Sequence, residues 1–196
     1  MQDRDLLLLS SSTVDVILEF EGTFPIEGGV SRQVIDTTIE PGGEGNLLIV
    51  FNRMGGNILP VGPVGDDYYG QFLRSSLDML GIDTSQLRTV PGFTTPVANC
   101  LIDQNGVHSF VSTIQGCAFA SDEEVLTQLE RCKGVTLNGY YLTDPEHAFY
   151  GLTRKLAHRG KALGLPVFFD PGPFAASLTP EAMEDIYQCA TVISLN

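Results

Sequence analysis

Short apolar runs alternate with segments of helical periodicity along most of the chain. Leu6–Leu9 is a continuous apolar run that predicts a buried strand, and Val167–Asp170 has the same character. Between them, Tyr68–Leu80 repeats apolar residues every three or four positions, as an amphipathic helix does. Strands that alternate with helices are typical of a mostly parallel sheet flanked by helices. We therefore predict an α/β fold that forms one domain over residues 1–196.

The other elements of this α/β part follow from the same periodicities and from helix-capping residues. Ser121 with Glu124 has the spacing of a capping box, and Thr179 followed by Pro180 is a common helix start. On this basis we predict helices over 47–54, 121–129, 144–163 and from 180 onward, and strands at 57–61, 87–90, 134–138 and 191–195.

Two further regions, approximately within 14–40 and 95–112, predict a second, smaller sheet. In the first region Val14 and Val16 alternate with Asp15, so one side of the strand is mostly polar. In the second region the dipeptide Asn105-Gly106 joins two strand-like runs and is a strong hairpin signal. We expect these strands to lie outside the main sheet.

Two glycine clusters flank the helix predicted over 47–54. Gly42 and Gly43 follow a proline, so the chain must turn sharply there, and bare backbone at a helix start is open to a ligand. The apolar residues of the helix are three or four positions apart, which predicts one buried face formed by Leu47, Leu48, Val50, Phe51 and Met54.

The second glycine cluster, residues 62–67, is predicted to be a tight loop after the strand at 57–61. Asp66 or Asp67 is expected to cap the helix that follows this loop.

The composition excludes several classes of function. With 24 acidic and 11 basic residues, the net charge is −13, which disfavours binding to nucleic acid or to anionic membranes. The four cysteines form no CxxC pair, so we predict no metal site and a reducing, cytoplasmic environment. The apolar run Leu6–Leu9 is too short for a signal peptide or a membrane span.

The glycine clusters and their neighbours also carry a family resemblance. It rests on Pro41-Gly42-Gly43, Asn46, Gly55, Val64-Gly65-Asp66-Asp67 and Gly70. This pattern resembles the N-terminal signature of the ribokinase-like (PfkB) carbohydrate kinases, and similar features extend from about Leu6 to Asn196. The resemblance implies transfer of the γ-phosphoryl group of ATP to a sugar hydroxyl with Mg²⁺. It also implies that the small sheet is a lid over the sugar and that a homodimer forms through this lid.

The resemblance implies a substrate site made by Asp15, Gly42, Gly43 and Asn46. An acid accepts hydrogen bonds from sugar hydroxyls, and the glycines let the sugar reach the backbone. The chain departs from the family pattern in two ways: the asparagine follows the glycine pair one residue early, and Leu48 stands where a small residue is common.

Other polar residues have less defined roles. Thr95 and Asn99 on the predicted hairpin are candidates to face the sugar. Asp170, which ends a strand, serves either a structural turn or a ligand contact. Asn196 is similar to the first residue of the family's Asn-x-x-Glu element, which implies a contact with the cofactor. We predict no metal ligand.

The catalytic base of the family lies in a Gly-x-Gly-Asp loop, and the 196 residues contain no such loop. We therefore expect the C-terminal ATP-binding part and the base to be absent and the chain alone to be inactive.

Fructose, ribose, 2-keto-3-deoxygluconate and nucleosides all remain open as substrates. The alternatives are a non-catalytic sugar-binding or regulatory module on the same fold and a Rossmann-type domain, the latter weakened because Gly42–Gly45 lacks the GxGxxG spacing.

Overall fold

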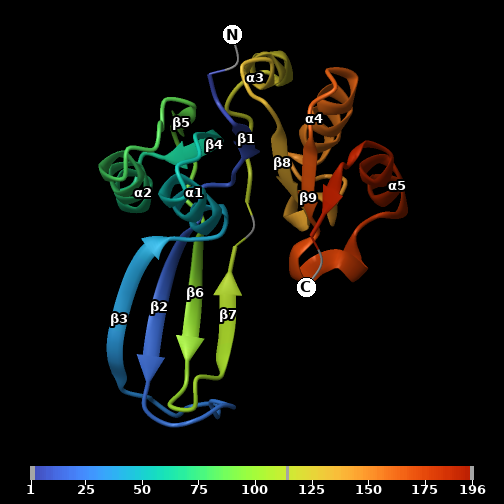
Figure 1. The fold of residues 1–196 in the computed structure, drawn as a ribbon. Coiled ribbons are helices and arrows are strands. Elements are labelled where there is room, and N and C mark those ends of the chain that lie inside the picture. Colours follow the sequence, from blue (N-terminus) through green and yellow to red (C-terminus); the bar gives the residue numbers. More distant parts are fainter. Residues whose placement is uncertain (1–2, 114, 195–196) are drawn as a thin grey trace.

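The computed structural model describes residues 3–113 and 115–194. Within this part, a six-stranded sheet is flanked by helices, and a four-stranded sheet projects from it (Figure 1). This is the predicted α/β architecture. None of the helices in the described ranges combines the length and apolar composition that crossing a bilayer requires.

The strands of the larger sheet run in the order β10-β9-β8-β1-β4-β5, and every pairing between neighbours is parallel. Their bounds are β1 Leu6–Leu9, β4 Ile58–Gly65, β5 Leu87–Val90, β8 Val135–Asn138, β9 Val167–Asp170 and β10 Val192–Ile193. Because all strands point the same way, their carboxyl ends meet at one edge of the sheet. In open α/β sheets this edge is where ligands bind.

Helices cover both faces of this sheet. The side chain of Leu8 packs with α1 (Glu44–Arg53) and α2 (Tyr68–Met79), whereas Leu7 and Leu9 pack on the other side with α3 (Asp122–Leu129), α4 (Tyr150–Ala162) and α5 (Pro180–Cys189). Alternate residues of one strand thus supply two cores. Burial on this scale stabilises a leucine by about 1.5–3 kcal/mol, which explains why the first strand is apolar throughout.

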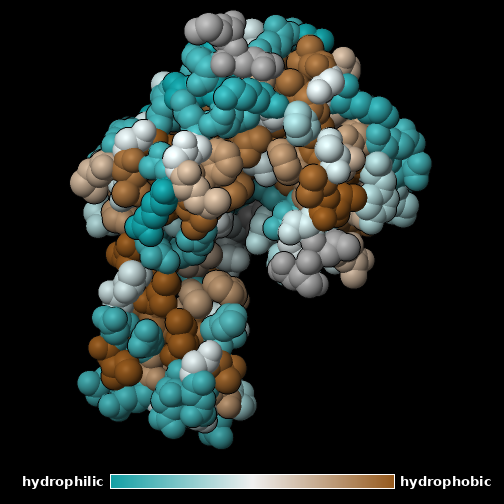
Figure 2. All heavy atoms as spheres, viewed as in Figure 1, coloured by the Kyte–Doolittle hydropathy of each residue, from teal (hydrophilic) through white to brown (hydrophobic). Residues whose placement is uncertain are grey.

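The smaller sheet has the order β3-β2-β6-β7 and mixed pairing: β2 is parallel to β6, and each has an antiparallel outer neighbour. Its strands are β2 Val14–Phe20, β3 Val34–Pro41, β6 Val97–Ile102 and β7 His108–Ser112. Figure 2 shows apolar and polar residues side by side on this projecting sheet. Every residue of β7 is exposed.

Three predicted helix caps are present. Ser121 and Glu124 form a capping box, Asp67 accepts from the backbone N–H of Gly70, and Thr179 accepts from that of Ala182. These bonds satisfy backbone donors that a helix leaves unpaired at its start. Two short 3₁₀ helices, η1 (Gly139–Leu142) and η2 (Gly172–Ser177), follow β8 and β9.

The predicted buried face of α1 was wrong for three of its five residues. Leu48 is buried, but Leu47, Val50 and Met54 are 39%, 55% and 81% exposed. The buried residues of this helix are instead Glu44, Gly45 and Leu48. This orientation is consistent with the hydrogen bonds that hold the carboxyl of Glu44 inside the protein, and part of the apolar row faces outward.

The predicted end of the strand at Val61 was also wrong, because β4 continues to Gly65. Its first half pairs with β1, and its second half pairs with β5. A Cβ atom at Gly62 would lie 2.0 Å from the carbonyl oxygen of Ser10, so the glycine permits a close approach of two backbones. The glycines that indicated a loop are therefore part of a strand.

The helix predicted from Asp144 begins later, at Tyr150. Asp144 accepts from the backbone N–H of Glu146, and the side chain of His147 accepts from that of Phe149, so these residues form successive turns. The rings of His147 and Phe149 also pack against Tyr141. This packing holds the segment away from a helical path. The last predicted strand is short, and Leu195 lies outside the described residues.

Candidate functional site

A cavity of about 410 Å³ lies between the carboxyl edge of the large sheet and the projecting sheet. The surface is hollowed between the projecting sheet and the C-terminal side of the core (Figure 2). The cavity adjoins β1 and β8, which are neighbours in the sheet. From β1 the strand order continues to β4 on one side, and from β8 it continues to β9 on the other. The point where the strand order reverses in this way commonly binds ligands. Its lining residues are Ser11, Thr13, Asp15, Gly43, Glu44, Asn46, Ala98, Phe110, Ser112, Thr113, Tyr140, Pro173 and Phe174.

Asp15 and the glycine turn are in direct contact. Asp15 lies on β2, and Gly42 follows the neighbouring strand β3. A Cβ atom at Gly42 would lie 1.9 Å from Oδ1 of Asp15 and 2.7 Å from its backbone nitrogen. Only glycine fits this position. The structure therefore brings together the predicted acid and the predicted turn, with a cavity beside them.

The half-buried carboxyl of Asp15 has a raised pKa. Burial is the main cause, and the nearby carboxylate of Glu40 on β3 adds to it, while the backbone N–H of Gly43 acts in the opposite direction. Burial removes water from the charged form and so favours the proton. A carboxylate with unused acceptor positions in such a place binds a hydroxyl donor readily.

Gly43 and Asn46 present the start of α1 to the same cavity. Gly43 is the N-cap residue of the helix, with φ 53°, a left-handed conformation that glycine adopts without strain. Gly43 and Asn46 are both exposed and line the cavity. The amide of Asn46 can both donate to and accept from a ligand. Three of the four predicted substrate residues, Asp15, Gly43 and Asn46, line this cavity. Gly42 lies behind them, where it contacts Asp15 and lines a separate, smaller void.

Glu44 is a site residue that the sequence reasoning missed. Its side chain is 9% exposed, and its Oε1 accepts from Nδ2 of Asn138 at 2.6 Å and from the hydroxyl of Tyr141. Its Oε2 lies 3.4 Å from Oγ of Ser10. The backbone N–H of Ser11 donates to Tyr141 at 2.7 Å. One carboxyl thus ties the helix start to the ends of β1 and β8.

The pKa of Glu44 is raised. Burial is the main cause, and the hydrogen bonds from Tyr141, Asn138 and Ser10 oppose it. The pKa of Tyr141 is raised well above its usual value, first by burial and then by the adjacent carboxyl of Glu44. A signal for Glu44 was present in the sequence, because it is the only charged residue between Pro41 and Asn52.

Aromatic side chains line another part of the cavity. Tyr140 and Phe174 meet edge to face with ring centroids 5.4 Å apart, and Phe110 reaches the cavity from β7. Phe110 is 57% exposed, so a ligand in the cavity has an open aromatic surface to contact. Sequence reasoning did not find these residues, because they come from three separate segments.

Several sequence candidates do not line the cavity. The hydroxyl of Thr95 accepts from the backbone N–H of Gly65, and Asn99 donates to the carbonyl of Val111. The carboxyl of Asp170 accepts from the backbone N–H of Gly172 at 2.8 Å, as in a structural turn. Asn196, the predicted cofactor contact, lies outside the described residues.

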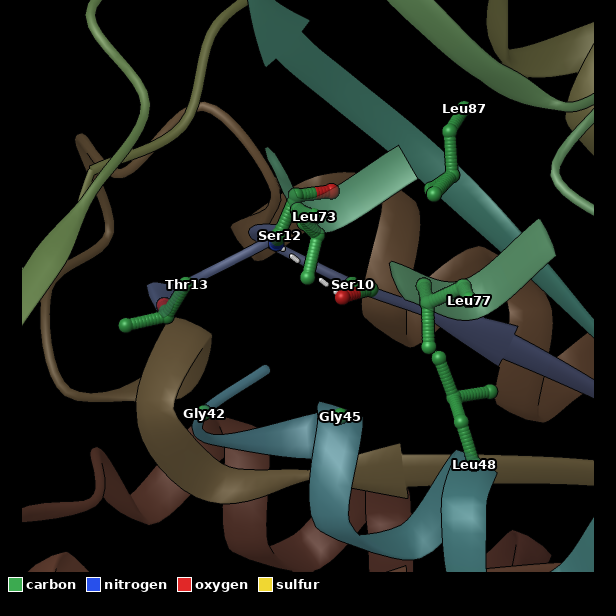
Figure 3. Close-up of a pocket in the computed structure, with 9 residues that line it drawn as sticks. All are labelled: Ser10, Ser12, Thr13, Gly42, Gly45, Leu48, Leu73, Leu77 and Leu87. Atoms are coloured by element: carbon green, nitrogen blue, oxygen red, sulfur yellow. Dashed lines mark hydrogen bonds between the residues drawn. The ribbon is translucent and has the colours of Figure 1, made fainter. Parts of the chain in front are cut away.

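A much smaller void lies behind the glycine turn (Figure 3). Its volume is about 10 Å³, and four leucines from helices and a strand form much of its wall. Ser12 also lines it, with a φ of 62° and a buried hydroxyl that has no partner among the described residues. The void has room for about one water molecule and is too small for a sugar.

Clustered metal ligands are missing from the described residues, and cationic side chains are missing from the described lining of the cavity. No group of three or more His, Cys, Asp or Glu side chains in residues 3–113 and 115–194 is arranged to hold a metal ion. The lining of the cavity contains no Lys, Arg or His in the part that the structure describes. The described lining of the cavity therefore offers no cationic side chain to the phosphates of a nucleotide.

A comparison with protein families matches residues 3–196 to the pfkB family carbohydrate kinases. Among curated proteins, the chain is 25% identical over 171 residues to a nucleoside kinase of Methanothermobacter thermautotrophicus. The match covers 87% of this chain and 53% of that protein. The chain thus spans about half the length of this curated relative.

Solved structures show the same fold. Arabidopsis thaliana ribokinase complexed with ribose and ATP has a TM-score of 0.75 at 18% identity, with 97% of this chain and 59% of that chain covered. Burkholderia thailandensis nucleoside kinase in complex with inosine has a TM-score of 0.70 at 21% identity, with 96% and 59% covered.

Proposed function

The chain belongs to the pfkB family of carbohydrate kinases, and we propose that it carries the substrate site for transfer of the γ-phosphoryl group of ATP to a hydroxyl of a sugar or nucleoside. One observation carries this proposal: Asp15, the Gly42-Gly43 turn and Asn46 meet at a single cavity. The similar proteins support the choice of substrate, since they include a nucleoside kinase and a ribokinase complexed with ribose and ATP.

Different residues of the cavity make different kinds of contact with the ligand in this proposal. Asp15 accepts hydrogen bonds from ligand hydroxyls, Asn46 donates or accepts through its amide, and Gly43 offers bare backbone at the helix start. Phe110 and Phe174 supply apolar surface for the carbon face of a sugar or for a base. A cavity lined by both polar and aromatic residues suits a ligand that has both polar groups and apolar surface.

We propose that the catalytic base lies outside these 196 residues. This proposal is supported by the sequence, which contains no Gly-x-Gly-Asp loop. By the family's chemistry, ATP and Mg²⁺ are the proposed co-substrate and metal, and the projecting sheet is the proposed lid and dimer surface. A cytoplasmic location is proposed from the free cysteines.

The test is calorimetric titration of the 196-residue chain with D-ribose, D-fructose, 2-keto-3-deoxygluconate, adenosine and inosine, each with and without ATP. We expect at least one of these compounds to bind without ATP and none to be phosphorylated. The Asp15→Asn variant should lose about tenfold to a hundredfold in affinity, because a charged hydrogen bond contributes about 1.5–3 kcal/mol. Absence of binding to every compound would refute the proposed site.

The alternative is a non-catalytic sugar-binding or regulatory module. It is favoured by the observation that the described lining of the cavity contains no cationic side chain for the phosphates of ATP. Robust ATP-dependent turnover by the 196-residue chain would refute both the alternative and the proposed position of the base. Turnover only by a longer protein that contains this chain would support the kinase.

A further inference from the structure

The acidic side chains that line the cavity have no cationic side chain beside them among the described lining residues. Asp15 and Glu44 are the charged residues of its lining, and both are acids. Among the lining residues that the structure describes there is no Lys, Arg or His. When these carboxyls are ionised, an anionic ligand in the cavity meets like charge at close range, and burial of the carboxyls strengthens the repulsion.

The start of a helix is ordinarily a place where anions bind, since its unpaired N–H groups and dipole attract negative charge. The start of α1 faces the cavity through Gly43, so this attraction would be expected here. Glu44 is the acidic residue of the first turn of this helix. The chain's own carboxyl thus stands where a ligand phosphate would be attracted.

The carboxyl of Glu44 is fixed in this position. Asn138 and Tyr141 donate to its Oε1, and the carboxyl is buried at the junction of α1, β1 and β8. A side chain held by two donors from another part of the sheet does not swing away when a ligand enters. The carboxyl is therefore a fixed part of the cavity wall, and its charge is present where the pH exceeds its raised pKa.

We propose that this cavity selects ligands that carry no phosphate or carboxylate group, and that Glu44 determines this selectivity. The inference rests on the proposed function, because it takes the cavity as the substrate site. It assigns a role to a residue outside the predicted substrate set. It also narrows the substrate to an uncharged sugar or nucleoside, which excludes sugar phosphates and sugar acids such as 2-keto-3-deoxygluconate.

The test compares matched ligand pairs that differ by one phosphate: D-ribose with D-ribose 5-phosphate, and adenosine with adenosine 5′-monophosphate. Affinities are measured by calorimetry at about pH 8.5, because the raised pKa of Glu44 makes its negative charge grow as the pH rises. We expect the uncharged member of at least one pair to bind about a hundredfold more tightly than its phosphate. In Glu44→Gln this ratio should fall at least about tenfold.

The glutamine variant keeps the geometry, because its amide oxygen accepts from Asn138 and Tyr141 and its NH₂ group donates to Ser10. The matched control is Glu123→Gln, which removes one exposed negative charge on α3 and should leave the ratio unchanged.

Each outcome decides the inference. Phosphates that bind as tightly as the uncharged ligands would overturn the selectivity and leave the proposed function standing. Selective binding that Glu44→Gln does not alter would overturn the role of Glu44. If no member of either pair binds and the wider panel of sugars also fails, the proposed function falls and the inference falls with it.

Discussion

At the scale of single residues, the site depends on one position that has no side chain. Gly42 lies so close to Asp15 that a Cβ atom would overlap the carboxyl and press on the backbone nitrogen. The Asp15 carboxyl and the turn can share the edge of the cavity only because that atom is missing. The contact joins β2 to the loop before α1, so it also fixes the projecting sheet to the core.

We predict that Gly42→Ala loses about 1–3 kcal/mol of stability, since overpacking forces the backbone or Asp15 to move. The variant should also lose ligand affinity, which calorimetry measures beside thermal melting. The control is Gly28→Ala, where a Cβ atom meets nothing within 4 Å and the change should stay within about 0.5 kcal/mol. A Gly42→Ala protein with unchanged stability and affinity would contradict the close contact.

The buried acid Glu44 predicts an unusual dependence of stability on pH. Its pKa is raised in the folded protein above the ordinary value of 4.5, so the folded state holds the proton more tightly than the unfolded chain. The resulting stabilisation is complete below pH 4.5 and is lost as the pH rises through the raised pKa. Ionisation of Glu44 therefore costs stability at neutral and alkaline pH.

Glu44→Gln cannot ionise and should remove this cost. We expect its melting temperature to match that of the natural protein at about pH 4 and to exceed it by at least about 2 °C at pH 8.5, where 1 kcal/mol corresponds to about 2–4 °C. Differential scanning calorimetry across this range measures the difference. The difference in melting temperature between Glu44→Gln and the natural protein should grow with pH. If this difference instead fell as the pH rose, the raised pKa of Glu44 would be contradicted.

At the scale of secondary-structure elements, the loop after β4 shows how one acid joins two elements. Oδ1 of Asp67 accepts from the backbone N–H of Gly70 in α2, and Oδ2 accepts from that of Thr95 before β6, both at 2.8 Å. Burial acts to raise the pKa of Asp67, but these backbone hydrogen bonds outweigh it and the pKa is lowered. The stabilisation is therefore present above pH 3.8 and is lost as the pH falls through the lowered pKa.

We predict that Asp67→Ala loses about 1–2 kcal/mol of stability at neutral pH, because both backbone donors lose their partner. Urea denaturation measures the loss. The neighbouring Asp66→Ala is the matched control, since Asp66 is exposed and does not cap the helix. Equal losses in the two variants would show that capping by Asp67 is not the cause.

The helix α1 illustrates the limit of periodicity at this scale. Its apolar residues have helical spacing, and the helix is present, yet three of the five predicted core residues are exposed. The spacing of apolar residues predicts that a helix forms. Which face of the helix is buried depends on how the helix is rotated about its axis against its neighbours. In α1 that rotation is consistent with the burial of Glu44, a contact with residues 94 and 97 positions away.

At the scale of the whole molecule, the candidate site exists only where two sheets meet. Asp15, Ala98 and Phe110 come from the projecting sheet, whereas Tyr140 and Phe174 come from the core. The four-stranded sheet thus projects from the carboxyl edge of the six-stranded sheet (Figure 1). A ligand in this cavity would contact both sheets, so binding and the relative position of the sheets are coupled.

The sequence by itself determined the local features: the buried strand Leu6–Leu9, the caps at Ser121 and Thr179, a cap at either Asp66 or Asp67, the hairpin after β6 and the sharp turn at Gly42. Each depends on residues within a few positions of one another, so its signal is local. With the family resemblance, these features also indicated which residues form one side of the site.

Only the tertiary structure decided which residues complete the site and which faces are buried. The carboxyl of Glu44 became internal because donors on β8 and η1 surround it, and Phe110 and Phe174 share a cavity because separate sheets bring them together. β4 extends through two glycines because they let it lie against β1 and then β5. Contacts between distant segments leave no periodic pattern in the chain, and for that reason sequence reasoning did not find them.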